Sequence, residues 1–76
     1  MKPTHQQRND FLARLPLPGV RFEHNTYVNV VAGTWQGDAG SIISVEELGD
    51  DPLYLVELES GKDALISQSS LRLPDA

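Results

Sequence analysis

The sequence predicts an all-β fold, a small and partly open barrel of about five short antiparallel strands behind a short N-terminal helix or disordered leader. Two patterns carry this prediction. Apolar residues alternate with polar ones in short runs, and Gly, Asn, Asp and Pro separate these runs. Length adds a third argument, because a flat sheet within 76 residues would leave one face wet, so the strands must curl around their core.

The central stretch is residues 28–45, which reads VNVVAGTWQGDAGSIISV. Two alternating apolar runs flank a loop that contains Gly33, Gly37, Gly40 and the single tryptophan, Trp35. This pattern predicts a strand at 27–32, a broad loop bent at its glycines, and a strand at 41–46.

The other strands follow from alternation and from turn signals. They are expected at 20–23, 53–59, 63–67 and 71–73. In residues 53–59, Tyr54, Val56 and Leu58 share one face, and Ser60-Gly61 closes a tight hairpin into the next strand. Leu71 and Leu73 are expected to face inward.

Residues 1–19 form a leader distinct from the barrel at 20–76. Thr4 and Gln7 have the spacing of a capping box, and Pro16 prevents a helix from continuing. A helix at about 5–15 is therefore predicted. It is near the length at which isolated helices are marginal in water, so it persists only if its apolar residues dock, and the alternative is a disordered tail. Residues 15–19 (LPLPG) read as a stiff linker.

Charge is distributed unevenly along the chain. Residues 1–21 carry four basic side chains against one acidic, a balance of +3, whereas residues 22–76 carry two against ten, a balance of −8. An acidic body repels phosphate backbones, so we expect no binding to nucleic acid.

The remaining composition excludes several classes of protein. There is no cysteine, which rules out disulfides, thiolate metal sites and cysteine catalysis. No apolar run is long enough to span a membrane, and the first ten residues lack the hydrophobic segment of a signal peptide. We therefore expect a soluble, cytoplasmic protein without membrane contact.

The pattern V-x-V-x-x-G-x-W-x-G-x-x-G-x-I, from Val28 to Ile42, resembles the KOW motif of ribosomal and transcription-elongation proteins. This resemblance covers residues 20–74 and implies an SH3-like barrel shaped by the glycine and aromatic loop. RNA-binding members carry Lys and Arg around this loop, whereas Asp38 is the only charged residue in the loop here.

A second resemblance, to the plasmid-borne type II dihydrofolate reductases, rests on chain length, a loose leader and Trp35-Gln36-Gly37. It implies a tetramer around a central pore. That family lines its pore with a lysine before the loop and with VQIY on a late strand. The matching places here hold Val30 or Val31 and residues 64–67 (ALIS), which supply no cofactor or folate contacts. No reductase activity and no cofactor are therefore expected.

Other candidates for catalysis or metal binding are sparse. His5 and His24 are too few and too far apart in sequence for a metal site, and no HxxxH or paired-carboxylate spacing accompanies them. Serines 67, 69 and 70 lack a nucleophile elbow. Asp50-Asp51 lacks the repeat of a calcium loop. Catalytic and metal-binding residues are expected to be absent.

The most informative residues are apolar side chains on the predicted outer face. Strand parity turns Leu53, Leu55 and Leu65 outward, and such a patch usually marks an interface. A second copy, a separate protein, or the leader helix through Phe11, Leu12 and Leu15 could cover it. Trp35 adds a loop-tip contact or a plug over the open barrel end.

The function expected from these features is a non-enzymatic module for protein interaction or self-association. The alternatives are a pore-type oligomeric enzyme of the type II reductase kind and a divergent KOW module that binds nucleic acid.

Overall fold

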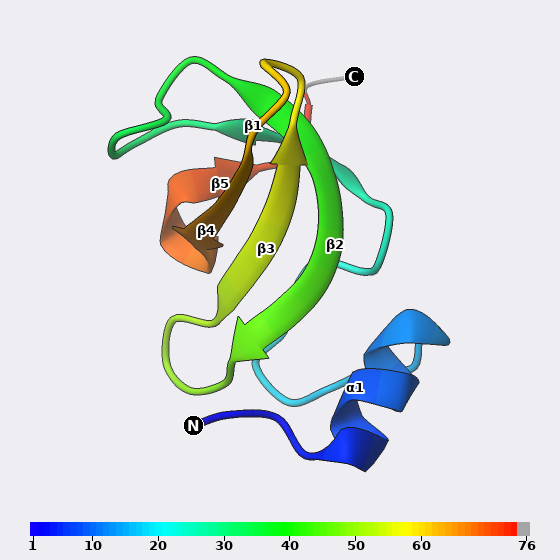
Figure 1. Ribbon diagram of the computed structural model, residues 1–76. Helices are drawn as coiled ribbons and strands as arrows, with labels where there is room; N and C mark the ends of the chain where they lie inside the picture. The colour runs from blue at the N-terminus through cyan, green and yellow to red at the C-terminus, as the bar shows by residue number, and fades with distance from the viewer. Residues whose placement is uncertain (75–76) are drawn as a thin grey trace.

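The computed structural model describes residues 1–74, so the last two residues of the unit predicted at 20–76 lie outside it. In chain order its elements are α1 (His5–Leu12), β1 (Tyr27–Val30), β2 (Ala39–Glu47), β3 (Leu53–Leu58), β4 (Asp63–Ser67), the 3₁₀ helix η1 (Gln68–Ser70) and β5 (Leu71–Arg72) (Figure 1). No helix in this part of the chain has the length and apolar character needed to cross a membrane.

The five strands form one antiparallel sheet in the order β4-β3-β2-β1-β5, which confirms the predicted small all-β fold with one short helix. Strand β2 is the longest strand and curves along the sheet (Figure 1). Its pairing with β3 is interrupted between Ile42 and Ser44 and again between Val45 and Glu47. Such irregularities bend a strand and increase its twist. They allow β2 to curve while it stays paired with both β1 and β3.

The core lies on the inner side of the sheet and follows the predicted parity. Tyr54, Val56 and Leu58 are buried on β3, and the inward residues of β4 and β5 are buried with them. The wider cluster comprises Phe11, Leu17, Phe22, Val28, Val30, Ile42, Val45, Leu48, Ala64, Ile66 and Leu71. The inward prediction for Leu73 is wrong, since this side chain is 58% exposed. Strand β5 ends at Arg72, so nothing holds Leu73 in the alternation.

The strand predicted at 20–23 is absent. A glutamine side chain makes the hydrogen bonds that a neighbouring strand would have made. Gln68 is buried in η1. Its Oε1 accepts hydrogen bonds from the Arg21 N–H (2.9 Å) and from the Tyr54 hydroxyl, while its Nε2 donates to the carbonyl of Gly19 (3.2 Å). The Phe22 N–H donates to the Tyr54 hydroxyl (3.4 Å). Because these side chains satisfy the backbone, the segment needs no strand partner.

Helix α1 has the predicted capping box. The Gln7 N–H donates to Thr4 Oγ1 (3.1 Å) and the Thr4 N–H donates to Gln7 Oε1 (2.8 Å). The helix ends at Leu12, three residues before the predicted end, because Arg14 adopts a left-handed conformation (φ 59°). The N–H of Leu15 then donates to the carbonyl of Asp10 (2.8 Å), and that of Arg14 to Phe11 (3.0 Å), as in a Schellman motif.

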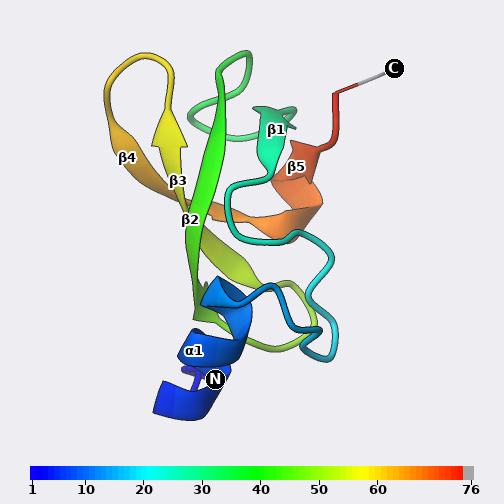
Figure 2. The same ribbon diagram turned by 90° about the vertical axis from the view of Figure 1, so that its right-hand side faces the viewer.

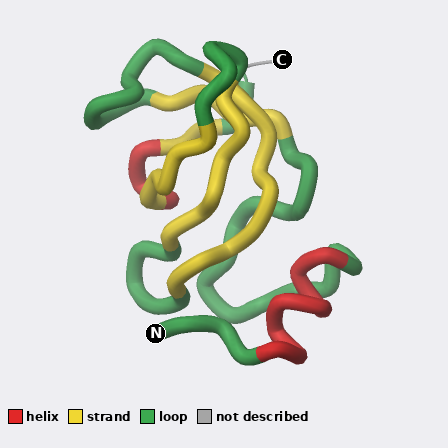
Figure 3. The backbone as a smooth tube through the Cα atoms, in the orientation of Figure 1, coloured by secondary structure: helices red, strands yellow, loops and turns green. Residues whose placement is uncertain are grey.

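The leader helix is docked at one end of the sheet, beside β2 (Figures 2 and 3). Phe11 is only 3% exposed, with its ring centroid 6.4 Å from that of Tyr54 and 6.3 Å from that of His24. An ion pair between Arg8 and Glu46 (3.6 Å) adds a polar contact. Of the three leader residues predicted as a contact surface, Phe11 is therefore part of the protein's own core, whereas Leu12 and Leu15 remain exposed.

Candidate functional site

The outer surface of the β3–β4 hairpin carries the predicted apolar residues in cross-strand pairs. The register places Leu53 opposite Ser67, Leu55 opposite Leu65, and Glu57 opposite Asp63. We call these six residues the outer hairpin face. Side chains directly opposite each other on two antiparallel strands interact, so this face contains a leucine pair beside an acidic pair.

Exposure on this face agrees with the predicted strand parity. Leu65 is 56% exposed, and Leu53 and Leu55 are half-buried, whereas the residues that alternate with them on β3 are fully buried. Helix α1 makes its strand contacts mainly with β2 and lies beyond the end of the sheet (Figure 2). Within residues 1–74 the leader therefore leaves Leu65 mostly exposed, with Leu55 half-buried beside it.

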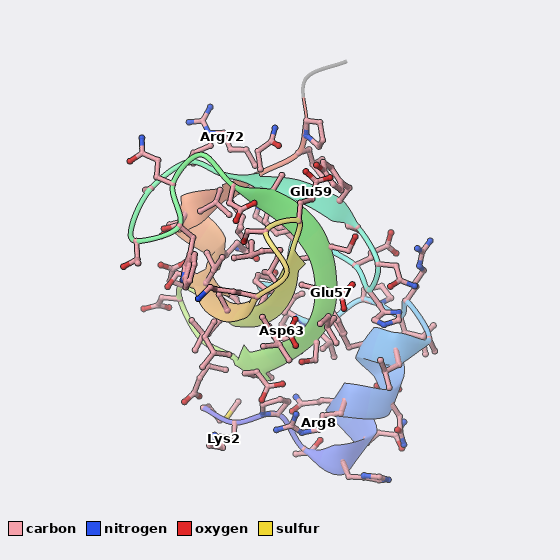
Figure 4. All side chains as sticks on the ribbon, turned by 45° about the horizontal axis from the view of Figure 1, so that its top comes forward. Lys2, Arg8, Glu57, Glu59, Asp63 and Arg72 are labelled. Atoms are coloured by element: carbon pink, nitrogen blue, oxygen red, sulfur yellow. The ribbon has the colours of Figure 1, made fainter. Side chains whose placement is uncertain are left out.

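The acidic pair has no basic partner among the described residues. Ion pairs within residues 1–74 connect Met1 to Glu47 and Arg8 to Glu46, and neither involves the hairpin. Figure 4 shows Glu57, Glu59 and Asp63 on the hairpin, while Lys2 and Arg8 lie with the leader. Like charges directly opposite in a sheet are destabilising. Lys62 in the turn offsets only part of the charge of Glu57, Glu59 and Asp63, so this end of the hairpin is net negative.

The loop that contains Trp35 is closed by backbone hydrogen bonds at the end of β1. The Val30 N–H donates to the carbonyl of Asp38 (2.9 Å), and the Gly37 N–H donates to the carbonyl of Val30 (3.0 Å). Gly33 and Gly37 have positive φ (84° and 95°), as the glycine-bent loop predicted. The loop holds Trp35 half-buried against the core cluster.

The structure brings Trp35 and Leu65 to one groove of about 190 Å³ beside β4. One side consists of Leu65, Ile66 and Ser67 from β4. The rest of the lining is Val30, Ala32, Gly33, Thr34, Trp35 and Ser70. Leu53 and Leu55 do not line this groove, so the predicted interaction residues divide between the groove and the adjoining outer hairpin face.

Asp38 fastens the Trp35 loop to the β3–β4 hairpin. Its carboxylate accepts hydrogen bonds from the Ser60 hydroxyl (2.6 Å) and from the Ala39 N–H (2.8 Å). These donors, Ser60 first, stabilise the charged form and lower the pKa of Asp38 below its ordinary value. The position of the groove wall thus depends on an ionised carboxylate.

This dependence predicts a loosening of the loop in acid. Because the folded pKa of Asp38 is lowered, its contribution to stability is complete above the unfolded pKa of about 3.9 and is lost as pH falls through the folded pKa. The fluorescence of Trp35, the only tryptophan, should change over this range. In Asp38→Asn this step should vanish, and an unchanged titration in that variant would contradict the assignment.

The titratable side chains of the described part of the chain do not cluster as metal ligands would. Residues 1–74 contain no group of three or more His, Asp or Glu side chains arranged to hold a metal. The Ser69 hydroxyl and N–H both donate to Asp51 (2.7 and 2.9 Å), which lowers the pKa of Asp51. His24 lies against Phe11 rather than beside a serine hydroxyl. These polar groups have structural roles in turns and core contacts.

The sequence patterns did not identify several residues of the groove and of the outer hairpin face. Thr34, Ser67 and Ser70 line the groove, and Glu57 and Asp63 form the acidic pair. The acidic pair had a usable signal, since the tight Ser60-Gly61 turn determines which residues of the two strands are opposite. The groove had no such sequence signal, because the residues of its two walls are far apart in the sequence.

Comparisons of the chain with protein-family models, curated proteins and solved structures found no match. Functional interpretation therefore depends on the site itself. That site offers an apolar pair, adjoining carboxylates, and a groove walled by a tryptophan.

Proposed function

We propose that the protein is a non-enzymatic, SH3-like small barrel that binds another protein through the outer hairpin face. The barrel assignment is supported by the sheet order, in which β1 has both β2 and β5 as neighbours, and by the resemblance of residues 28–42 to the KOW motif. The partner is a protein segment that presents an apolar side chain next to Lys or Arg.

One observation carries this proposal, namely the Leu55–Leu65 pair directly beside the Glu57–Asp63 pair. In the free protein a mostly exposed leucine gains little from burial, and two facing carboxylates repel each other. An apolar residue laid on the leucines and a cation placed between the carboxylates would relieve both costs. The arrangement therefore favours a partner with both features.

The energy available is sufficient for a modest interaction. Fully burying a leucine contributes about 1.5 to 3 kcal/mol, and hydrogen bonds to charged groups contribute about 1.5 to 3 kcal/mol. Association consumes much of this gain in lost freedom of motion. The face is thus suited to a reversible partner that is recognised through a short segment.

Charge selects among the possible occupants. The chain has a net charge of −5, and nucleic acid would add phosphates to an already acidic face. A second copy would bring the same acidic pair toward the face. A basic and apolar protein segment complements it in both charge and polarity.

The test is selection of a displayed random-peptide library on the full chain. Enriched peptides should combine Lys or Arg with apolar residues and should lose at least about tenfold in affinity for Leu65→Glu, equivalent to 1.4 kcal/mol. Leu73→Glu is the matched control, because Leu73 is almost equally exposed (58% against 56%) but follows β5, the opposite edge strand of the sheet.

Two results would refute the proposal. One is a set of enriched peptides that bind Leu65→Glu as well as they bind wild type. The other is a homodimer, detected by light scattering, that Leu65→Glu dissociates, since the face would then belong to a second copy. Amide spectra should show that both variants stay folded, because the inner side of β4 is unchanged.

A further inference from the structure

Strand β4 is an edge of the sheet with free backbone hydrogen-bonding groups. Leu58 N–H donates to the Lys62 carbonyl and Gln68 N–H to the Pro52 carbonyl, so bonded pairs with β3 alternate from these two ends. By this alternation, the N–H and C=O groups of Asp63, Leu65 and Ser67 point away from β3. The N–H groups of all three residues, and the C=O groups of Asp63 and Leu65, have no hydrogen-bond partner within residues 1–74. The C=O of Ser67 instead caps the 3₁₀ helix η1, whose first residue is Gln68.

This edge lacks three of the features that commonly protect an edge from an added strand. Proteins commonly blunt edges with proline, a bulge or a very short strand. The opposite edge, β5, has only two residues and is followed by Pro74. In contrast, β4 has five residues, contains no proline and pairs with β3 without a register shift.

The groove of about 190 Å³ runs beside this free edge. Leu65, Ile66 and Ser67 form its β4 side, and the loop that contains Trp35 forms the facing wall. A chain that extends the sheet lies about 4.8 Å from β4, and a further strand would lie about 4.8 Å beyond it. An added chain at this spacing would run along the groove beside Leu65, Ile66 and Ser67.

We propose that the partner segment binds as an added antiparallel strand on β4, inside this groove. This inference rests on the proposed function and specifies how the partner is held. Residues opposite Asp63 and Leu65 would form hydrogen-bonded pairs with them, and the Ser67 N–H would donate one further bond. The side chains of the residues opposite Asp63, Leu65 and Ser67 would then lie on the outer hairpin face.

Side-chain chemistry then defines the segment. It carries Lys or Arg opposite Asp63, an apolar residue opposite Leu65 and a polar residue opposite Ser67. The two intervening residues face the side where Val30 and Ile66 lie, and are apolar. From N to C terminus the pattern is therefore polar, three apolar residues, then basic.

Ser67 offers a selective test of the backbone contacts. Its φ of −71° matches the fixed angle of proline, and its N–H faces the groove without an internal partner. Ser67→Pro should thus remove one donor while the fold persists. Ser67→Ala is the matched control, since it removes the hydroxyl and keeps the N–H.

The probe is the acetylated, amidated hexapeptide Ser-Val-Leu-Val-Arg-Arg, titrated into the full chain and followed by amide NMR. Binding should slow hydrogen exchange at the amides of Leu65 and Ser67. Ser67→Pro, and separately a peptide with N-methylated leucine, should each weaken binding about threefold to tenfold, the effect of one hydrogen bond. Ser67→Ala, which keeps the N–H, should weaken binding less than Ser67→Pro does.

Strand addition is wrong if the hexapeptide shows no saturable binding, if the two amides gain no protection, or if Ser67→Pro binds as tightly as Ser67→Ala. None of these results alters the library selection, in which Leu65→Glu alone decides whether the outer hairpin face binds protein. Failure of the binding mode is thereby separated from failure of the proposed function.

Discussion

Replacing Gly40 with alanine is expected to lower the free energy of unfolding by at least about 3 kcal/mol, the upper end of the usual cost of overpacking. A Cβ atom at this position would lie 2.1 Å from the carbonyl oxygen of Glu57 and 2.9 Å from Cα of Leu58. Both obstacles are backbone atoms of β3, so no side chain can turn aside. Strands β2 and β3 would have to separate along their shared ladder.

Urea denaturation checks this prediction, with Gly37→Ala as the control. Gly37 has a positive φ of 95°, but a Cβ there meets nothing within 4 Å. Its substitution should therefore cost only backbone strain, about 1 to 2 kcal/mol. Equal losses in the two variants would mean that the close approach of β2 and β3 at Gly40 is unimportant to stability.

Truncating Phe11 to alanine is the second change with a large expected effect, about 3 kcal/mol. The side chain is 3% exposed and contacts the ring of Tyr54, so its removal leaves a cavity between α1 and the sheet. An eight-residue helix is too short to persist in water without docking. We therefore expect loss of helical structure in the leader together with the loss of stability.

Leu12→Ala is the matched control within the same helix. Leu12 is 54% exposed, and alanine is a good helix former, so stability should change by less than about 0.5 kcal/mol. Circular dichroism and urea denaturation of both variants make the comparison. If Phe11→Ala melts like Leu12→Ala, the leader is not held by its phenylalanine.

Local patterns predicted the elements whose stabilising contacts are local. Alternation of Tyr54, Val56 and Leu58 gave the buried face of β3, and Ser60-Gly61 identified the hairpin that follows. The Thr4 and Gln7 capping box placed the start of α1 correctly. Each signal spans only a few residues, so one sequence was enough to find it.

The remainder depends on contacts between distant residues. Residues 20–23 resemble a strand, yet Gln68 takes up the backbone groups that a neighbouring strand would otherwise bind. Gly40 was predicted within the loop, whereas it lies in β2 because β3 approaches closely there. The groove beside β4 is likewise lined by residues that precede β2 in the sequence and by residues that follow it. No local sequence pattern predicts contacts between residues this far apart.

The hydrogen bonds of Gln68 also determine when, during synthesis, the segment at Gly19 and Arg21 can be held in place. Its partners Gly19 and Arg21 precede it by 49 and 47 residues. At about 5 to 20 residues per second, the leader waits about 2 to 10 s before this glutamine is made. During that interval Phe11 and Leu17 have no finished core to enter. The backbone at Gly19 and Arg21 is therefore fixed by this side chain only after Gln68 has been made, and a newly made molecule exposes that segment until then.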